Sequence, residues 1–452
     1  MKIKHFSAEN VHGYLYYDID FRDDLTFLIG LNGSGKTTVL KLISGLLTPK
    51  YLNLVQIKFS EMELTLADKD RIFTIVARQK EKKLFITLNN SQPDEFPILS
   101  SQKIDEFMNE TSFDTSEITD SIKKFEASPY AKKIKDNIKE PIILGLDRRR
   151  TEFSEIDNDD MLEYIFRRKF FNQIEKYEGV DKALADIKEK LYKKVRKNAQ
   201  KIQELNREFQ EKVLIEIMKF EDKSVSDLLS DKFDLENELD DLNNRRKKFD
   251  EIFQSLKVPD LEETFDNVFD KAKNMLAEIS DANDNDLKRF FKLLIDWIRL
   301  KNKLNDIDKM YEVGKEFSSD ITMLNLPFKR LKDSLNLFFS ETKKEVDITG
   351  EGDLKIKIKT GASKTNSIFE LSSGEKQLVI LFSQLALAQD SKIFIVDEPE
   401  LSLHLTWQEK FVDALQTACP EMQFILATHA PAIVNKNNRI SYCVNLSKMN
   451  EK

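Results

Sequence analysis

Residues 30–37 read Gly-Leu-Asn-Gly-Ser-Gly-Lys-Thr and match the G-x-x-x-x-G-K-[ST] pattern of a phosphate-binding loop. The loop follows the short apolar run 25–29, which predicts a buried strand, and precedes residues 36–47, whose apolar positions recur with a helical period. Glycines in such a turn let backbone N–H groups approach a phosphate, and the N-terminus of the next helix adds partial positive charge. The order strand, glycine loop, helix therefore predicts a nucleoside triphosphate site.

The side chains of this loop have separable expected roles. Lys36 is expected to neutralise the β- and γ-phosphates of ATP, and the Thr37 hydroxyl to bind Mg²⁺. A glycine-rich turn with a chance lysine is the simpler alternative, but the flanking strand and helix argue against it. The residues of this segment expected to bind the nucleotide are Asn32, Gly33, Ser34, Gly35, Lys36, Thr37 and Thr38.

A second apolar run, residues 393–396, ends in two acids, Asp397 and Glu398. Ligands bind at the carboxyl ends of the strands in parallel sheets, so these carboxylates are placed where a ligand would lie. Asp397 is suited to hold Mg²⁺ and Glu398 to orient and polarise an attacking water molecule. Alone, the run would read as a strand with an acidic turn. Beside the phosphate loop it indicates ATP hydrolysis, with Glu398 as a catalytic residue.

A third motif lies at residues 371–377, Leu-Ser-Ser-Gly-Glu-Lys-Gln. Ser372 is expected to cap a helix whose N-terminus, opened by Gly374, can receive an anion. Ser372 and Glu375 also read as an ordinary capping box. The position of the motif between the phosphate loop and the acidic strand favours a functional role.

These three elements, in this order, resemble the Walker A, signature and Walker B motifs of ABC-type ATPases. Thr428-His429, after the expected strand 423–427, resembles the switch histidine of that family, which implies that His429 contacts the γ-phosphate and is a second catalytic residue. The resemblance also implies that Ser372 and Gly374 act on ATP held by another copy of the chain. ATP would then hold together a homodimer or a higher oligomer.

Strand and helix patterns at both ends of the chain flank a charged middle that is poor in glycine and proline. We therefore expect an α/β fold, in which an ABC-type P-loop ATPase head is formed by residues 1–154 and 345–452 around an all-α insertion, residues 155–344. Heptad-like stretches near 184–209 and 235–256 predict two helices, for which pairing as a short hairpin is one option. Because Asn198 and Arg246 interrupt the apolar seam, a compact helical subdomain and a short coiled coil both stay open.

Outside these motifs the patterns are weaker. Residues 52–66 and 71–88 alternate and predict antiparallel strands, whereas residues 90–138 are poorly patterned. The segment 10–14 resembles the adenine-side loop of the family, with His12 where a basic residue is common. Gln56 is a candidate for the Q-loop glutamine, although it lies in a strand pattern.

The long separation of Lys36 from Ser372 argues against a transporter subunit. The insertion, Glu375 and residues 398–404 resemble the RecF, SMC and OLD-like branch, although Leu405 replaces its usual proline. Within that branch the chain looks most like the PtuA family, the ATPases of Septu and retron anti-phage systems. This implies a regulatory ATPase with a partner HNH nuclease, a PtuB-like subunit. No nuclease domain is expected in this chain, because it ends soon after His429.

Two alternatives remain open. One is a RecF/SMC-like DNA-repair ATPase that acts on DNA without a nuclease partner. The other is a scaffold that binds ATP with negligible turnover. An adjacent HNH gene would favour the defence function.

The composition limits how the chain could contact nucleic acids or membranes. Lys and Arg total 71 against 79 Asp and Glu, a net charge of -8, so DNA or RNA contact would need local patches such as residues 148–150 or 193–197. A solvated charge run explains both patches as well. Two cysteines are too few for a disulfide framework, and no run approaches eighteen apolar residues. We expect a cytoplasmic protein with no membrane partner.

Overall fold

The computed structural model describes residues 1–68, 71–100, 102–104, 116–145, 179–218, 234–256, 259–281, 287–359, 364–388, 391–434 and 436–450. The chain divides into two compact units, one of Met1–Lys194 with Pro327–Lys452, and one of Val195–Leu326. We call the first unit the head and the second the helical unit. Both ends of the chain build the head, and the elements described within the helical unit are helices, so the expected α/β fold is confirmed.

The head is built on a five-stranded parallel sheet in the order β14-β3-β13-β12-β8. Its inner strands are nearly continuous apolar runs, because helices cover both faces of such a sheet. The strands are β3 (Leu25–Ile29), β8 (Ile142–Leu144), β12 (Ile393–Asp397), β13 (Gln423–Ala427) and β14 (Cys443–Asn445). The longer helices from the two ends of the chain are α1 (Lys36–Leu47), α12 (Ser373–Leu387) and α13 (Leu405–Ala418).

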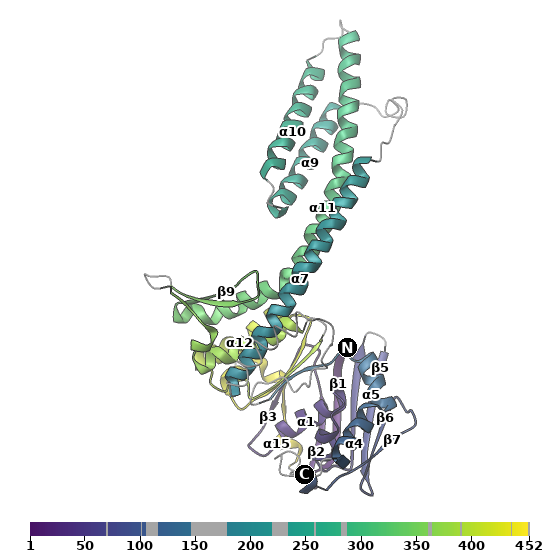
Figure 1. Cartoon of the computed structure of the whole chain (residues 1–452), viewed down its shortest axis with the longest axis vertical. Coiled ribbons are helices and arrows are strands. Elements are labelled where there is room, and N and C mark those ends of the chain that lie inside the picture. The colour runs from purple at the N-terminus through teal and green to yellow at the C-terminus, as the bar shows by residue number, and fades with distance from the viewer. Residues whose placement is uncertain are drawn as a thin grey trace. The chain divides into compact units, whose positions relative to one another are not determined.

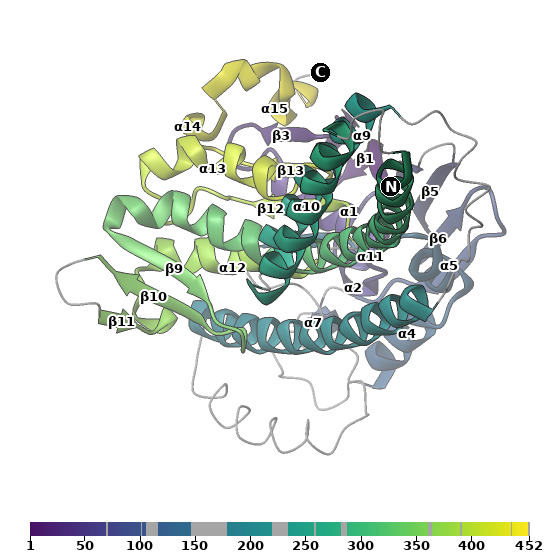
Figure 2. The ribbon, with the colours of Figure 1, turned by 90° about the horizontal axis from the view of Figure 1, so that it is seen from above.

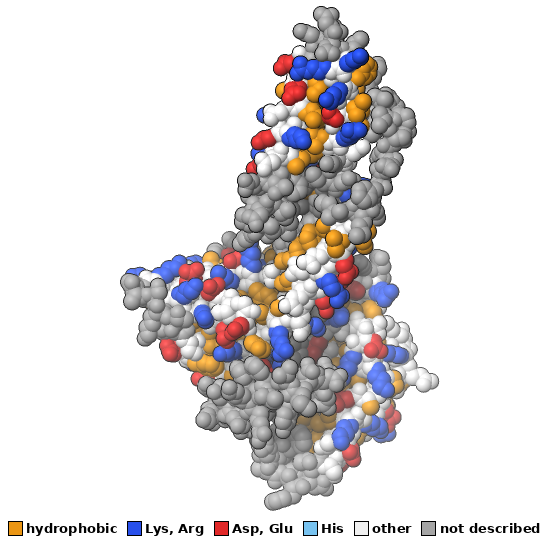
Figure 3. Space-filling view, turned by 45° about the horizontal axis from the view of Figure 1, so that its top comes forward, with side chains coloured by type: hydrophobic (Ala, Val, Ile, Leu, Met, Phe, Trp, Pro, Cys, Tyr) orange, Lys and Arg blue, Asp and Glu red, His pale blue; other side chains and the backbone are white. Residues whose placement is uncertain are grey.

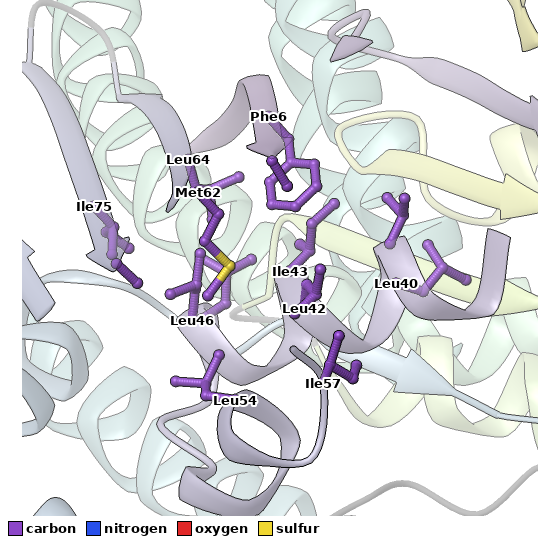
Figure 4. Close-up of a cluster of buried hydrophobic side chains, with 14 of the residues drawn as sticks. Phe6, Leu40, Leu42, Ile43, Leu46, Leu54, Ile57, Met62, Leu64 and Ile75 are labelled. Atoms are coloured by element: carbon purple, nitrogen blue, oxygen red, sulfur yellow. The ribbon is translucent and has the colours of Figure 1, made fainter. Parts of the chain in front are cut away.

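A second, antiparallel sheet of six strands in the order β2-β1-β4-β5-β6-β7 comes from the N-terminal part alone. One apolar core joins it to α1 and to one face of the parallel sheet. Figure 4 shows Phe6, Met62 and Leu64 of this sheet beside Ile43 and Leu46 of α1. Its strands are β1 (Lys2–Val11), β2 (Leu15–Asp20), β4 (Glu61–Asp68), β5 (Arg71–Lys80), β6 (Lys83–Leu88) and β7 (Asp94–Pro97).

Two local predictions need correction. Residues 52–66 do not form one strand, because the helix α2 (Tyr51–Val55) comes first and β4 begins only at residue 61. The apolar residues Tyr51, Leu54 and Val55 have helical spacing and are buried. Gln56 lies exposed at the end of α2, not in a strand. The weakly patterned region 90–138 contains β7, α4 (Ser116–Glu126) and α5 (Pro129–Asn137).

The C-terminal part of the head adds a small antiparallel sheet in the order β11-β10-β9. Its strands are β9 (Lys344–Ile348), β10 (Leu354–Ile358) and β11 (Lys364–Asn366). The short helices are α14 (Pro431–Val434) and α15 (Leu446–Met449), and 3₁₀ turns occupy Ser340–Thr342, Ile368–Glu370 and Lys436–Tyr442.

The long helices that the structure describes after the N-terminal part of the head are drawn in Figures 1 and 2. They are α7 (Gly179–Met218), α9 (Leu235–Leu256), α10 (Pro259–Ser280) and α11 (Leu287–Phe339). The compact units divide within α7 and within α11, whereas the sequence placed the insertion at 155–344. The start of α7 and the end of α11 belong to the head because Leu184, Leu191 and Leu335 are buried in its core.

The hairpin option for residues 184–209 and 235–256 is wrong. Within the helical unit α7 pairs with α11, where Phe209 stacks on Phe317 with ring centroids 4.7 Å apart. Helix α9 instead packs with α10 and α11 in a separate core that includes Leu242, Phe269 and Trp297. The sequence showed two apolar seams but not that α11 supplies the partner of both.

Asn198, which seemed to interrupt the seam, has a specific partner. It is buried, and its Nδ2 donates to the Leu324 carbonyl at 2.7 Å. Pro327 lies within α11 and has no N–H to donate to the Met323 carbonyl, so this turn lacks one helical hydrogen bond. The amide therefore fixes α7 against a turn of α11 that proline weakens.

The surface of the described helical unit carries charges of both signs between apolar side chains on the face shown in Figure 3.

The basic run Arg148 to Arg150 lies outside the described residues. Among the described helices, none combines the length and the apolar character needed to cross a bilayer.

Gln423 joins the two large sheets of the head. Its side chain is fully buried, with Oε1 accepting from the Ile3 N–H at 2.8 Å. Its Nε2 donates to the carbonyls of Ile3 and Arg22, both at 2.7 Å. One amide thus satisfies three backbone groups of the N-terminal sheet and the turn that follows it.

We expect Gln423→Leu to lower the free energy of unfolding of the head by roughly 3 kcal/mol, because it leaves these backbone groups without their partner. Urea denaturation followed by circular dichroism measures the loss. Gln92→Leu, at an exposed glutamine, serves as the control and should stay within about 0.5 kcal/mol of the parent. Equal stability of the two variants would contradict this role of Gln423.

Candidate functional site

The phosphate loop, residues 30–37, connects β3 to α1. Gly35 has φ +85°, in the left-handed region, and forms the N-terminal boundary of α1. A Cβ at Gly35 would lie 1.8 Å from the Tyr17 hydroxyl oxygen, and that hydroxyl donates to the Ser34 carbonyl at 3.2 Å. Position 35 therefore needs glycine both for its backbone conformation and for its packing.

Lys36 lies over its own loop. Its Nζ donates to the Gly30 carbonyl at 3.1 Å and to the Leu31 carbonyl at 3.4 Å, and the residue is only 5% exposed. Burial lowers the pKa of Lys36, and the nearby carboxylates, with Glu398 first, oppose that decrease. The ammonium is thus held at the centre of the loop, next to acids from the far end of the chain.

Thr37 and Asp397 connect the two ends of the chain directly. The Thr37 hydroxyl donates to Asp397 Oδ2 at 2.8 Å, across 360 residues. Asp397 ends β12 and is 4% exposed. A hydroxyl and a carboxylate are the hard oxygen ligands that Mg²⁺ takes in nucleotide sites, where phosphate oxygens and water fill the remaining positions. The pair therefore fits a magnesium ion.

Glu398 follows β12 in a left-handed conformation, φ +50°, while its N–H still donates to the Ala427 carbonyl at 2.8 Å. Such backbone conformations in residues other than glycine concentrate at functional sites. Burial raises the pKa of Glu398, the carboxylates of Glu400 and Asp397 raise it further, and Lys36 opposes them. The carboxyl group is therefore a stronger base than an ordinary glutamate.

His429 lies between Lys36 and Glu398. Its Nδ1 is 3.5 Å from Lys36 Nζ, and its Nε2 is 3.4 Å from Glu398 Oε1. Burial and the Lys36 ammonium lower the pKa of His429, so the ring is neutral at neutral pH. Because an ammonium only donates, Nδ1 acts as the acceptor, and Nε2 then carries the proton toward Glu398.

Glu400 is a functional residue that sequence reasoning missed, although its segment was quoted. Its carboxylate accepts from the Thr428 hydroxyl at 2.8 Å and from the backbone N–H groups of His429 and Ala430 at 2.7 and 3.0 Å. It fixes the loop after β13 to the loop after β12 and so positions His429. Only its place two residues after Glu398 hinted at this role.

The phosphate loop and the start of α1 also make contacts that no sequence pattern predicted. Ser447, in α15, accepts from the Leu31 N–H through its hydroxyl oxygen at 2.9 Å. The Thr38 hydroxyl lies 3.5 Å from His12 Nε2, which connects the expected adenine-side loop to the start of α1. At the crest of the loop, Asn32 and Gly33 are exposed.

Ser372 caps α12, and the capping box predicted with Glu375 is confirmed. Gly374 packs so closely against the next loop that a Cβ there would lie 2.3 Å from the Ser402 carbonyl oxygen. Glu375 is 1% exposed and accepts from Lys344 Nζ at 2.8 and 2.9 Å. Burial alone would raise the pKa of Glu375, but the hydrogen bonds from Lys344 and Ser372 outweigh it and lower that pKa.

The expected residues fall into two groups within the head. The phosphate loop, Asp397, Glu398 and His429 come together at the carboxyl ends of β3, β12 and β13. Ser372 and Gly374 belong to α12, which contacts β8. Three strand spacings separate β8 from β3, about 14 Å. Helix α12 thus packs near the edge strand β8, its first residues contact the loop after β12, and the phosphate loop follows β3.

A family model described as "AAA domain, putative AbiEii toxin, Type IV TA system" matches residues 25–435, from β3 past His429. The chain belongs to this family. The AAA-domain match spans both ends of the chain together with the insertion.

Among curated relatives, the chain is 29% identical over 206 residues to "Retron Vc95 probable ATPase" of Vibrio cholerae serotype O1 biovar El Tor, covering 39% of this chain and 40% of the relative. It is 26% identical over 132 residues to "Retron Ec83 probable ATPase" of Escherichia coli, covering 23% of this chain and 24% of the relative. The matches therefore span less than half the length of these relatives.

Solved structures with a likeness to the chain include heads of SMC proteins. One is the Smc head with an extended coiled coil bound to the C-terminal domain of ScpA, from Pyrococcus furiosus, at 15% identity and TM-score 0.40, covering 98% of this chain and 93% of that one. Another is the SMC head from Thermotoga maritima, at 12% identity and TM-score 0.38, covering 96% and 92%.

We expect Gly35→Ala to weaken ATP binding by at least about tenfold, because the added methyl group meets Tyr17 and displaces the loop. Gly179→Ala is the control, since Gly179 lies outside the site and also has a left-handed φ, +59°, but no atom within 4 Å of an added Cβ. It should cost only the backbone strain, about 1 kcal/mol of stability. Titration with a fluorescent ATP analogue and thermal unfolding compare the two. Equal losses of ATP affinity would show that the contact with Tyr17 is unimportant.

Proposed function

We propose that this chain is an ATP-binding and ATP-hydrolysing regulatory subunit of an anti-phage defence complex, and that ATP-dependent assembly of its heads controls a partner HNH nuclease. The observation that carries the ATPase part is the 2.8 Å contact of Thr37 with Asp397, surrounded by Lys36, Glu398 and His429. The family match supports the same activity.

The phosphate loop is assigned to nucleotide binding. Backbone N–H groups of residues 33–37 and the Lys36 ammonium would bind the β- and γ-phosphates. Thr37 and Asp397 would hold Mg²⁺, which supplies positive charge to the phosphate oxygens when bound. Lys36 would exchange its contacts with the Gly30 and Leu31 carbonyls for contacts with phosphate oxygens. This exchange moves only the lysine side chain and not the backbone.

Glu398 is assigned to the attacking water. Its raised pKa suits a carboxylate that accepts a hydrogen bond from water and polarises it toward the γ-phosphate. Neutral His429 would donate from Nε2 and so hold Glu398 or the γ-phosphate in place. Glu400 supports this arrangement because it fixes the backbone of His429.

Ser372 and Gly374 are assigned to ATP bound by a second copy of the chain. The strand order supports this assignment, because β13 and β12 lie between the phosphate loop strand β3 and β8 beside α12. A two-fold pair of heads would bring each α12 N-terminus onto the partner's γ-phosphate. Bound ATP would then stabilise a homodimer or a higher oligomer, and hydrolysis would release it.

The nuclease partner is the finer part of the proposal. Similarity to two retron ATPases supports a role in defence, and the resemblance to the PtuA family supports a PtuB-like HNH subunit and a Septu-type system. A RecF/SMC-like repair ATPase that acts on DNA alone is the other candidate. Any DNA or RNA contact would use local basic patches, given the net charge of -8.

We expect Glu398→Gln to lower ATP turnover by at least about a hundredfold while ATP affinity is kept, because glutamine holds water less strongly as a base but leaves the phosphate contacts intact. Lys36→Ala is the companion variant and should lose ATP affinity itself. Phosphate release and equilibrium binding measure the two effects. Loss of turnover without change in binding for Lys36→Ala, or full turnover for Glu398→Gln, would refute the assignments.

The partner is tested by expressing the tagged full-length chain together with the proteins encoded beside its gene. We expect an HNH nuclease to co-purify with the wild-type chain, and its DNA cleavage to change in the Glu398→Gln variant, because that variant retains ATP. Lys36→Ala should change the cleavage in the opposite sense. If no nuclease co-purifies and the chain binds DNA by itself in an ATP-dependent way, the repair candidate is correct.

A further inference from the structure

Lys344 is placed at the signature segment by a sharp change in chain direction. Helix α11 ends at Phe339, a 3₁₀ turn follows at Ser340–Thr342, and Lys343 is left-handed with φ +55°. Lys344, the first residue of β9, then lies with its Nζ 2.8 and 2.9 Å from the two carboxylate oxygens of Glu375. This contact joins the small sheet to the N-terminus of α12.

The carboxylate of Glu375 is held on both oxygens. Oε2 accepts from the Ser372 N–H at 2.9 Å and from the Ser372 hydroxyl at 3.0 Å, while Oε1 accepts from the Thr342 hydroxyl at 3.3 Å. Glu375 is 1% exposed, whereas Lys344 keeps a quarter of its side chain in solvent. The acid is therefore buried directly beneath the hydroxyl that caps α12.

This arrangement places a negative charge at a helix N-terminus that is proposed to receive a phosphate. A buried carboxylate 3.0 Å from Ser372 Oγ would repel a γ-phosphate that approaches the same hydroxyl. Lys344 cancels that charge through both oxygens, so the helix N-terminus keeps its attraction for an anion. A capping box alone does not require the cation, because glutamine completes it equally well.

We infer that Lys344 is a positioning residue of the signature segment: it neutralises Glu375 so that Ser372 and the N-terminus of α12 can bind the γ-phosphate of ATP held by a second copy of the chain. The inference rests on the proposed ATP-dependent association of heads. It adds to that proposal the Lys344 ammonium, which makes a signature segment containing Glu375 compatible with a bound phosphate.

The test uses the full chain with Glu398→Gln as the parent, so that ATP persists. We expect Lys344→Ala to weaken ATP-dependent association by at least about tenfold in analytical ultracentrifugation, because it leaves a buried carboxylate without its cation. The affinity of the single chain for ATP should stay within about twofold, because Lys344 pairs with Glu375 of α12, whereas the phosphate loop follows β3. Lys344→Gln keeps a hydrogen-bond donor without charge and should weaken association as well.

Removing the carboxylate separates charge from packing. In Lys344→Ala the further change Glu375→Gln should restore association, because no charge then needs cancelling and the capping box survives. Lys344→Arg should associate like the parent. Lys357→Ala is the matched control and should associate like the parent. Lys357 also pairs with an acid of the small sheet, Asp347, at 3.0 Å, but both side chains of this pair are more exposed than those of Lys344 and Glu375.

Four outcomes decide between these possibilities. Normal association of Lys344→Ala, or a double variant no better than the single one, would overturn the inference while leaving the proposed function intact. Rescue by the double variant would support it when Lys344→Ala keeps the thermal stability of the parent, because the loss of association then comes from charge at the N-terminus of α12 and not from a less stable head. If the Glu398→Gln parent itself does not associate with ATP, the proposed function fails and the inference fails with it.

Discussion

The candidate site depends on the parallel pairing of β3 with β13. This ladder places Leu25 to Leu28 beside Phe424 to Ala427 and so brings the phosphate loop next to the acids and the histidine of the C-terminal part. No contact within either end could assemble Lys36, Asp397 and His429. The buried amide of Gln423 strengthens the same junction, because it satisfies backbone groups of β1 and of the turn after β2.

The site carries more negative than positive charge. Asp397, Glu398 and Glu400 lie around Lys36, and burial raises the pKa of Glu398 while it lowers the pKa of Lys36. Each shift disfavours the charged form, which reflects an environment where charge is weakly solvated. A divalent cation at Thr37 and Asp397 would compensate the acids, and the nucleotide phosphates would in turn compensate the cation and Lys36. Binding of metal and nucleotide would therefore be coupled through charge.

The sequence predicted those parts of the fold that local patterns specify. Strands β3, β12 and β13 are short apolar runs, α1 follows a glycine loop, and the capping box of α12 needs only Ser372 and Glu375. Contacts across long separations were not predictable. Lys344 contacts Glu375, and α11 pairs with α7, because the tertiary fold brings these segments together. No local sequence pattern in either segment indicates its partner. The roles assigned to the site residues stay proposals.

The strand order has a consequence for biosynthesis. In the parallel sheet, β12 and β13 lie between β3 and β8. The two strands that the N-terminal part contributes to this sheet, β3 and β8, are therefore not neighbours in the folded head. While a ribosome is still making residues before 393, both strands have open edges and apolar faces, whereas the helical unit can already form from contacts closer in the chain. The nascent chain therefore spends most of its translation with the phosphate-loop strand unpaired, and this is the period in which chaperones would protect it from aggregation.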